Sequence, residues 1–123
     1  RPTKIMFYFL IGIGASLGAI SRHLISSYLL KITFFGFPIG TISVNILGCY
    51  LIGVFIAINL NSKEILLPLL IIGFLGSFTT FSAFTKEVLI FANENSFLQA
   101  YFIALIISSI CVFFTFMGYK MFS

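Results

Sequence analysis

The stretch that decides the fold is "GSFTTFSAF", Gly76–Phe84, which holds four hydroxyl-bearing residues and three phenylalanines within one short segment. It lies inside the run Ile65–Thr85, which contains no charged residue. Hydroxyl groups are costly in an apolar environment unless they find hydrogen-bond partners. The stretch therefore indicates a helix with a specialised polar segment, not one that only packs against its neighbours.

The composition of the whole chain predicts an all-α membrane protein. Of its 123 residues, 60% are hydrophobic and only 8% are charged. A soluble domain of this size would be unable to hide so much apolar surface. A membrane span needs about 20 apolar helical residues, and the charge-free runs have room for four. We predict one domain, 1–123, with transmembrane helices near Ile5–Leu30, Ile39–Leu60, Leu66–Ala92 and Phe97–Phe122.

The charged residues lie near the ends of the predicted spans and bear on orientation. The side that carries both termini has Arg1, Lys4, Lys63 and Lys120. The opposite side has Lys31, with Arg22 and Lys86 near its edge. Because the positive-inside rule depends on such loop bias, two topologies stay open: one fixed orientation with cytoplasmic termini, and insertion in both orientations.

Several classes of function are disfavoured by what the spans lack. No carboxylate is predicted at mid-membrane, which argues against a proton-coupled antiporter. Cys49 and Cys111 are best interpreted as small packing residues, and a single histidine, His23, excludes a histidine-based metal cluster within one chain. No nucleophile–base pair is visible, so we expect no enzyme. Without a soluble basic face, nucleic acid is not an expected partner.

The polar groups predicted inside the membrane are neutral hydroxyls, one amide and one cation near a span end. Donors of this kind suit an anion. Each also has a structural interpretation. Serine and threonine bond back to their own helix, Asn45 would link two helices, and Arg22 would extend toward water from its helix end. Taken together with the phenylalanine-rich segment, they favour an anion path.

We predict that the third helix is broken at Gly76. Gly73 and Gly76 weaken the helix, and threonine at 79 and 80 is a poor helix former. Gly76 lies ten residues after Leu66, which is about 15 Å and near the midplane of the membrane. Carbonyl groups freed there could hold a hard cation. Phe81 and Phe84 share a helix face, and their positive ring edges suit a small anion; core packing is the alternative.

Three segments resemble the signature segments of the Fluc/CrcB fluoride channels. They are "GIGASLGAISRH" (Gly12–His23), "GTISVNILG" (Gly40–Gly48) and "GFLGSFTTFSAFTKE" (Gly73–Glu87). The resemblance covers nearly the whole chain. It implies an antiparallel, dual-topology homodimer in the lipid bilayer of a prokaryotic inner membrane. It also implies passive, selective export of fluoride through two pores, with one structural sodium ion (Na⁺) between the subunits.

The resemblance also implies roles for individual residues. Phe81, Phe84 and Asn45 match the pore residues, and Ser82 matches a hydroxyl beside the pore. Three further hydroxyl-bearing residues are expected to line the pore, namely Thr80, Thr115 and Ser109. Arg22 and Glu87 match charged residues of the aqueous vestibule. The sodium ion would be held by the backbone carbonyls of Gly76 and Thr79.

The chain departs from the family pattern in two places. Ala83 stands where the family motif often has a second threonine. The fourth-helix polar track would fall on Ile103, Ile107, Cys111 and Thr115. Thr115 keeps this track, Cys111 is a second candidate for it, and Ser108 and Ser109 would substitute from a neighbouring register.

Two other functions compete with a passive fluoride channel. A small multidrug transporter is also a four-helix, dual-topology dimer, but it would need an acid within the first span, and Ile5–Ile20 has none. A non-catalytic assembly subunit of a larger complex would show no anion flux of its own.

Overall fold

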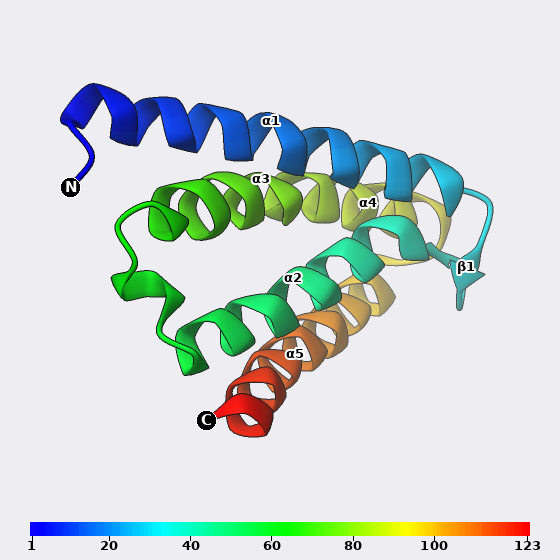
Figure 1. The fold of residues 1–123 in the computed structure, drawn as a ribbon. Coiled ribbons are helices and arrows are strands. Elements are labelled where there is room, and N and C mark those ends of the chain that lie inside the picture. The colour runs from blue at the N-terminus through cyan, green and yellow to red at the C-terminus, as the bar shows by residue number, and fades with distance from the viewer.

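The computed structural model describes residues 1–123 and consists of long helices joined by short connections (Figure 1). The helices are α1 (Lys4–Tyr28), α2 (Ile39–Ala57), η2 (Leu67–Leu75), α3 (Gly76–Phe78), α4 (Phe81–Glu94) and α5 (Phe97–Phe122). Four segments are long and apolar enough to cross a membrane, namely α1, α2, α5 and the stretch Leu67–Glu94 that unites η2, α3 and α4. The prediction of four helical membrane spans is confirmed.

The ends of the helices follow local side-chain chemistry. Thr3 Oγ1 accepts from the Met6 backbone N–H at 3.2 Å and begins α1, and Ser96 caps α5 in the same way. The second helix was predicted to continue to Leu60 but ends at Ala57. Asn59 adopts a left-handed conformation with φ of 61°, which asparagine tolerates and which commonly ends a helix. A 3₁₀ turn, η1 (Leu60–Ser62), follows.

A β-hairpin connects α1 to α2, where only a loop was expected. Its strands are β1 (Thr33–Phe34) and β2 (Phe37–Pro38), which pair antiparallel with Phe34 opposite Phe37. The backbone N–H of Ile39 donates to the Ile32 carbonyl at 3.1 Å and closes the base of the hairpin.

The helical conformation of the third span is interrupted at a different place from the one predicted. Its first part, η2, is a π-helix with Pro68 in its first turn, and it continues directly into α3. Gly76 has helical angles, φ −59° and ψ −28°, so the break is not at this glycine. Thr79 and Thr80 instead have extended backbone, with ψ of 152° and 128°. A glycine lowers helix stability by only about 1 kcal/mol, which packing overrides.

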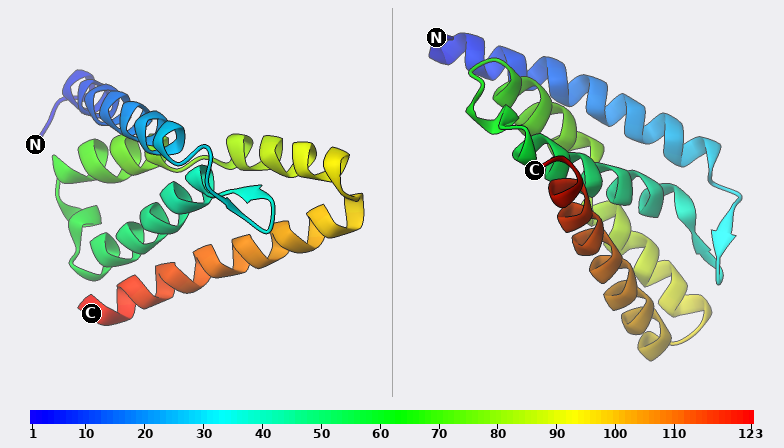
Figure 2. Two further views of the ribbon diagram at one scale, coloured as in Figure 1. Left: turned by 90° about the vertical axis from the view of Figure 1, so that its right-hand side faces the viewer. Right: turned by 60° about the horizontal axis from the view of Figure 1, so that its bottom comes forward.

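The helices pack as two pairs, with α1 along η2 and α3, and α2 along α5 (Figures 1 and 2). Glycines make both contacts close. The only buried residues of α1 are Gly14 and Gly18, and a Cβ at either would overlap backbone atoms of the third span. Gly53 and Gly118 have the same role between α2 and α5. Small residues at helix contacts are typical of membrane proteins.

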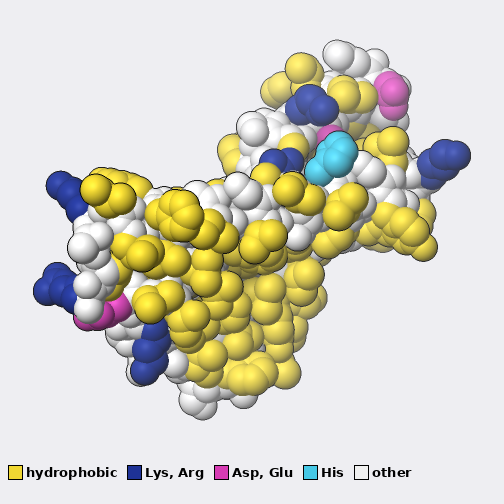
Figure 3. Space-filling model, turned by 45° about the horizontal axis from the view of Figure 1, so that its top comes forward, with side chains coloured by type: hydrophobic (Ala, Val, Ile, Leu, Met, Phe, Trp, Pro, Cys, Tyr) yellow, Lys and Arg dark blue, Asp and Glu magenta, His cyan; other side chains and the backbone are white.

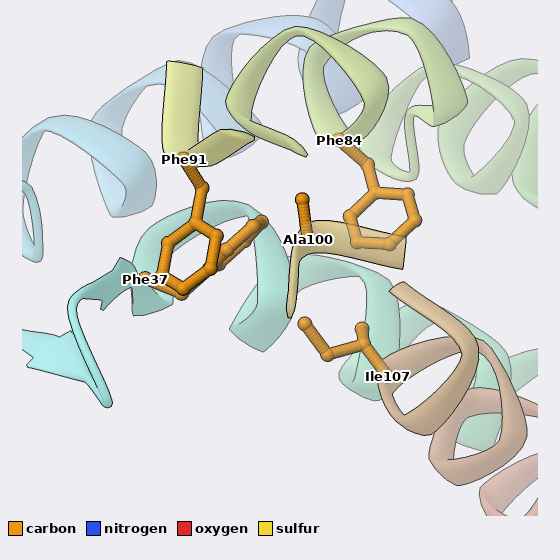
Figure 4. Packing of buried hydrophobic residues seen from close by; sticks show 5 residues of the cluster. All are labelled: Phe37, Phe84, Phe91, Ala100 and Ile107. Carbon is orange, nitrogen blue, oxygen red and sulfur yellow. The ribbon is translucent and has the colours of Figure 1, made fainter. Parts of the chain in front are cut away.

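The buried side chains form two small clusters. Val44, Leu75 and Phe78 form one, between α2 and the third span. The other lies where the hairpin, α4 and α5 meet (Figure 4), and consists of Phe37, Phe84, Phe91, Ala100 and Ile107. Most other large apolar side chains are exposed and cover the surface shown in Figure 3, as expected of a protein surrounded by lipid.

Candidate functional site

A pocket of about 290 Å³ lies beside the extended residues of the third span. Five predicted site residues line it: Asn45, Thr79, Thr80, Phe81 and Phe84. The remaining lining residues are Cys49 from α2 and Ile107, Ser108 and Cys111 from α5. None of the lining residues carries a charge, so the pocket offers neutral hydrogen-bond donors and aromatic rings.

Asn45 holds the extended backbone in place. Its Nδ2 donates to the Thr80 carbonyl oxygen at 2.9 Å, and its Oδ1 accepts from the Thr80 backbone N–H at 2.8 Å. The two bonds fix the orientation of the amide, since a backbone N–H only donates and a carbonyl only accepts. The side chain thus links two helices, as the alternative interpretation expected. One amide N–H remains free for a ligand, and the pore role of Asn45 stays a prediction.

Arg22, on α1, contacts the third span just before its extended residues. Its Nε donates to the Ser77 carbonyl oxygen at 3.0 Å, and the contact is partly buried. A cation near the carbonyl end of a helix is favourable, and Ser77 lies just before the helix gives way to extended backbone. Guanidinium has five N–H donors, so four remain available beyond this bond. The side chain therefore does more than extend toward water.

Thr79 presents a carbonyl oxygen that accepts no hydrogen bond within the chain. Its N–H and its Oγ1 both donate to the Leu75 carbonyl, at 3.1 and 2.9 Å. An unpaired carbonyl in an apolar surrounding needs a partner. Oxygen donors without a nearby carboxylate suit a monovalent hard cation, so the Thr79 carbonyl is chemically compatible with the predicted sodium site, which stays a prediction. Gly76, the other predicted ligand, is exposed.

Phe81 and Phe84 lie next to each other, with ring centroids 6.1 Å apart and planes tilted by 54°. Their surroundings differ. Phe84 is only 5% exposed and also packs against Phe37, so core packing accounts for part of its role. Phe81 is 74% exposed and has no such role.

Glu87 lies on the α4 side of a contact with α2. Its Oε1 accepts from the hydroxyl of buried Thr41 at 2.6 Å, and its Oε2 is buried without a hydrogen-bond partner. Sequence reasoning missed Thr41 in this role. The signal was present, because Thr41, Asn45 and Cys49 recur every four residues and so lie on one face of α2.

The other predicted site residues lie outside the pocket lining. Ser82 is exposed, with its Oγ 3.4 Å from Thr80 Oγ1. On α5, Ser109 is exposed, and Thr115 Oγ1 donates to the Cys111 carbonyl at 3.3 Å. Two other candidates of the fourth-helix track, Ser108 and Cys111, do line the pocket. The roles predicted for Ser82, Ser109 and Thr115 stay predictions.

Comparison with known proteins agrees with the resemblance of the three segments. A family model described as "CrcB-like protein, Camphor Resistance (CrcB)" matches residues 9–119. A protein of Shewanella baltica (strain OS185) named "Fluoride-specific ion channel FluC" is 37% identical over 114 residues, which are 91% of this chain and 92% of that protein. Proteins of the same name from Shewanella sp. (strain ANA-3) and Shewanella oneidensis are 36% and 35% identical over the same shares. The chain therefore belongs to the CrcB-like family.

Proposed function

We propose that this chain is a passive, fluoride-selective channel that exports fluoride across a prokaryotic inner membrane. The observation that carries the proposal is the pocket at Thr79–Thr80, which combines neutral donors with phenyl rings and has no charged lining residue. Relatives of the same family are named fluoride-specific ion channels. A small anion can exchange its hydration for such donors, and no lining group carries a proton across the membrane.

The donors that would receive fluoride are the free amide N–H of Asn45 and the hydroxyl of Thr80. Thr80 Oγ1 accepts from the Ala83 backbone N–H at 3.3 Å and lies 3.4 Å from Ser82 Oγ, where either hydroxyl can donate. The Thr80 proton is available to fluoride when Ser82 is the donor of that pair. The ring edge of Phe81 adds a weak positive field without a formal charge. Ser82, Ser109 and Thr115 would continue the path beyond the pocket.

We place the charged residues Arg22 and Glu87 at the aqueous vestibule. Glu87 already has one oxygen bonded to Thr41, which holds the carboxylate against α2 and away from the lining of the pocket. Arg22 has donors left after its bond to Ser77, and a cation at the mouth raises the local concentration of an anion.

The functional unit is proposed to be an antiparallel homodimer with two pores. Its two-fold axis would lie in the membrane plane, so that a residue on the axis meets its own copy. The carbonyls of Gly76 and Thr79 from both subunits would then surround one sodium ion. Two observations support this site: the exposure of Gly76 and the unpaired carbonyl of Thr79. When bound, the ion supplies a partner for carbonyls that lipid does not satisfy.

The deciding experiment is anion efflux from liposomes that contain the purified protein. We expect fluoride efflux, and chloride efflux no faster than from protein-free liposomes. An imposed pH gradient should leave the direction of fluoride movement unchanged, which separates a channel from a proton-coupled transporter. Equal permeation of the two anions would overturn the proposal, and a complete lack of flux would favour an assembly subunit.

Replacing Phe81 and Phe84 separately should distinguish a role in fluoride conduction from a role in core packing. Phe81→Ile and Phe84→Ile should each slow fluoride efflux, because isoleucine keeps the bulk but loses the polarised ring edge. Phe81→Ile should leave stability unchanged since the ring is exposed, whereas Phe84→Ile should lower it by about 1 kcal/mol. Efflux and thermal unfolding in detergent measure the two effects. Wild-type efflux in both variants would show that neither ring takes part in conduction.

Arg22→Ala should slow fluoride efflux by about threefold to tenfold at low ionic strength, and by less at high ionic strength, because salt screens the attraction. Arg22→Lys keeps the charge and should recover part of the rate. Efflux at two salt concentrations provides the test. A loss of the same size at both would show that only the bond to Ser77 matters.

Replacing sodium with a large organic cation should lower the stability of the dimer and its fluoride efflux together. The physical reason is that the Thr79 carbonyls would lose their partner. Size-exclusion chromatography and efflux in matched buffers give the two readouts. A dimer that is indifferent to sodium in both assays would rule out the proposed cation site and leave the channel proposal intact.

A further inference from the structure

The turn of the β-hairpin between α1 and α2 has a phenylalanine in an unfavourable conformation. Phe35 has φ of 53° and Gly36 has φ of 82°, between paired residues Phe34 and Phe37. Two consecutive residues of positive φ form the turn in which Asn-Gly is strongly preferred. A bulky residue at positive φ is an outlier, and such strain often marks a functional position.

The two aromatic rings at the tip of this hairpin point away from the protein. Phe35 is 80% exposed and Phe34 is 54% exposed, and their rings form an edge-to-face pair with centroids 4.5 Å apart. Phe37, in contrast, is fully buried and packs against Phe91 of α4, with ring centroids 5.9 Å apart. One phenylalanine therefore holds the hairpin to the protein, and two others are presented outward.

The position of the hairpin indicates what the exposed rings meet. It joins the end of one membrane span, at Tyr28, to the start of the next, at Ile39, and Figure 1 shows β1 at the end of the molecule where α1 finishes and α2 begins. A connection between two spans lies where hydrocarbon gives way to headgroups. Lys31, which precedes β1, is exposed. Segments that lie in this boundary bury phenylalanine side chains between headgroups and acyl chains, and lysine is attracted to anionic headgroups.

We propose that Phe34 and Phe35 insert as a pair into the boundary between headgroups and acyl chains, with Lys31 beside a lipid phosphate. The hairpin then anchors the α1–α2 connection in the membrane surface. Transfer of the two rings out of water offsets the strain at Phe35. The proposal does not depend on which ion the pocket conducts.

The chain contains no tryptophan, so Phe35→Trp introduces a single fluorescent reporter at the tip. Two sets of liposomes are compared, one with lipids brominated near the headgroup and one with lipids brominated deep in the acyl chain. We expect the tryptophan emission to be blue-shifted, and to be quenched more by the bromines near the headgroup. Phe34→Trp is the second variant if Phe35→Trp does not fold. Asn61→Trp lies in the exposed turn between the second and third spans. It is the control for a span connection without paired exposed phenylalanines, and its shallow quenching should be weaker than that of Phe35→Trp.

A matched variant tests the strained residue itself. Phe35→Asn suits the turn better, so it should fold as stably as the native chain in detergent. In the Phe34→Trp background it should weaken shallow quenching by about twofold, because half of the anchor is lost.

Three results would overturn the proposal. Long-wavelength emission from the Phe35→Trp variant would mean that the tip lies in water. Blue-shifted but unquenched emission from the same variant would mean that protein, such as a second copy, covers the tip. Unchanged quenching when Phe35→Asn is added to Phe34→Trp would remove Phe35 from the anchor.

Discussion

Asn45→Asp is expected to abolish fluoride efflux. The substitution is nearly isosteric, but it replaces the Nδ2 donor with a carboxylate oxygen that faces the Thr80 carbonyl, where the native bond is 2.9 Å. The carbonyl loses its partner, at a cost of about 1–3 kcal/mol. The negative charge would also stand in the lining of a pocket that is proposed to pass an anion. Both effects act in the same direction.

Two companion variants separate these effects of Asn45→Asp. Asn45→Ala removes the bonds without adding a charge, so it should destabilise the protein yet retain more efflux than Asn45→Asp. Asn45→Gln keeps the amide group on a longer side chain, and its fluoride efflux should lie between those of the native protein and Asn45→Asp. Efflux from liposomes is measured beside thermal unfolding in detergent. Normal conduction by Asn45→Asp would show that Asn45 serves only to link the helices.

Gly18→Val should prevent accumulation of folded protein. A Cβ at Gly18 would overlap the Phe74 carbonyl oxygen, and backbone is unable to move aside as a flexible side chain would. We expect a loss of about 3 kcal/mol or more, visible as an aggregated or absent peak in size-exclusion chromatography.

The same helix supplies the control for Gly18→Val. Gly12 has open space where a Cβ would lie, so Gly12→Val should behave as the native protein. If both variants were equally stable, α1 would not approach the third span as closely as described. If both failed, the helix would be intolerant of β-branched residues for reasons other than contact.

The positions of the spans were predictable from the sequence because charged side chains are costly in hydrocarbon and therefore lie near the ends of the spans. The predicted fourth helix has the observed bounds Phe97–Phe122, and the predicted second helix begins at the observed residue, Ile39. Charge-free runs do not define where a helix ends within a polar turn, so the end near Asn59 was missed. The hairpin was missed because Phe35 violates the turn preferences by which a two-residue hairpin is recognised.

The role of glycine was the main error of the sequence interpretation. Glycine weakens a helix and also lets two helices approach, and a single sequence does not separate these effects. At Gly73 the second effect operates, since a Cβ there would meet the Ile11 backbone. At Gly76 the helix simply continues. The extended residues, Thr79 and Thr80, are held by tertiary bonds that local propensity does not contain.

Many of the residues that line the pocket were predictable from the sequence, but the hydrogen bonds around the pocket were not. Asn45, Phe81 and Phe84 were identified as candidates from residue type and resemblance, and all three line the pocket. The partners of Arg22 and Glu87 lie 55 and 46 residues away in the chain. Pairings over such separations depend on how the helices pack, which periodicity does not encode.

The bonds that hold the third span also suggest an order of assembly during synthesis. Asn45 precedes Thr80 by 35 residues, and Arg22 precedes Ser77 by 55. Each supporting side chain therefore leaves the ribosome before the backbone group that needs it, in keeping with N-terminal segments folding first. When the extended residues are synthesised, their hydrogen-bond partners are already part of the chain. These peptide groups therefore never have to wait for a later segment of the chain to supply the partner that hydrocarbon lacks.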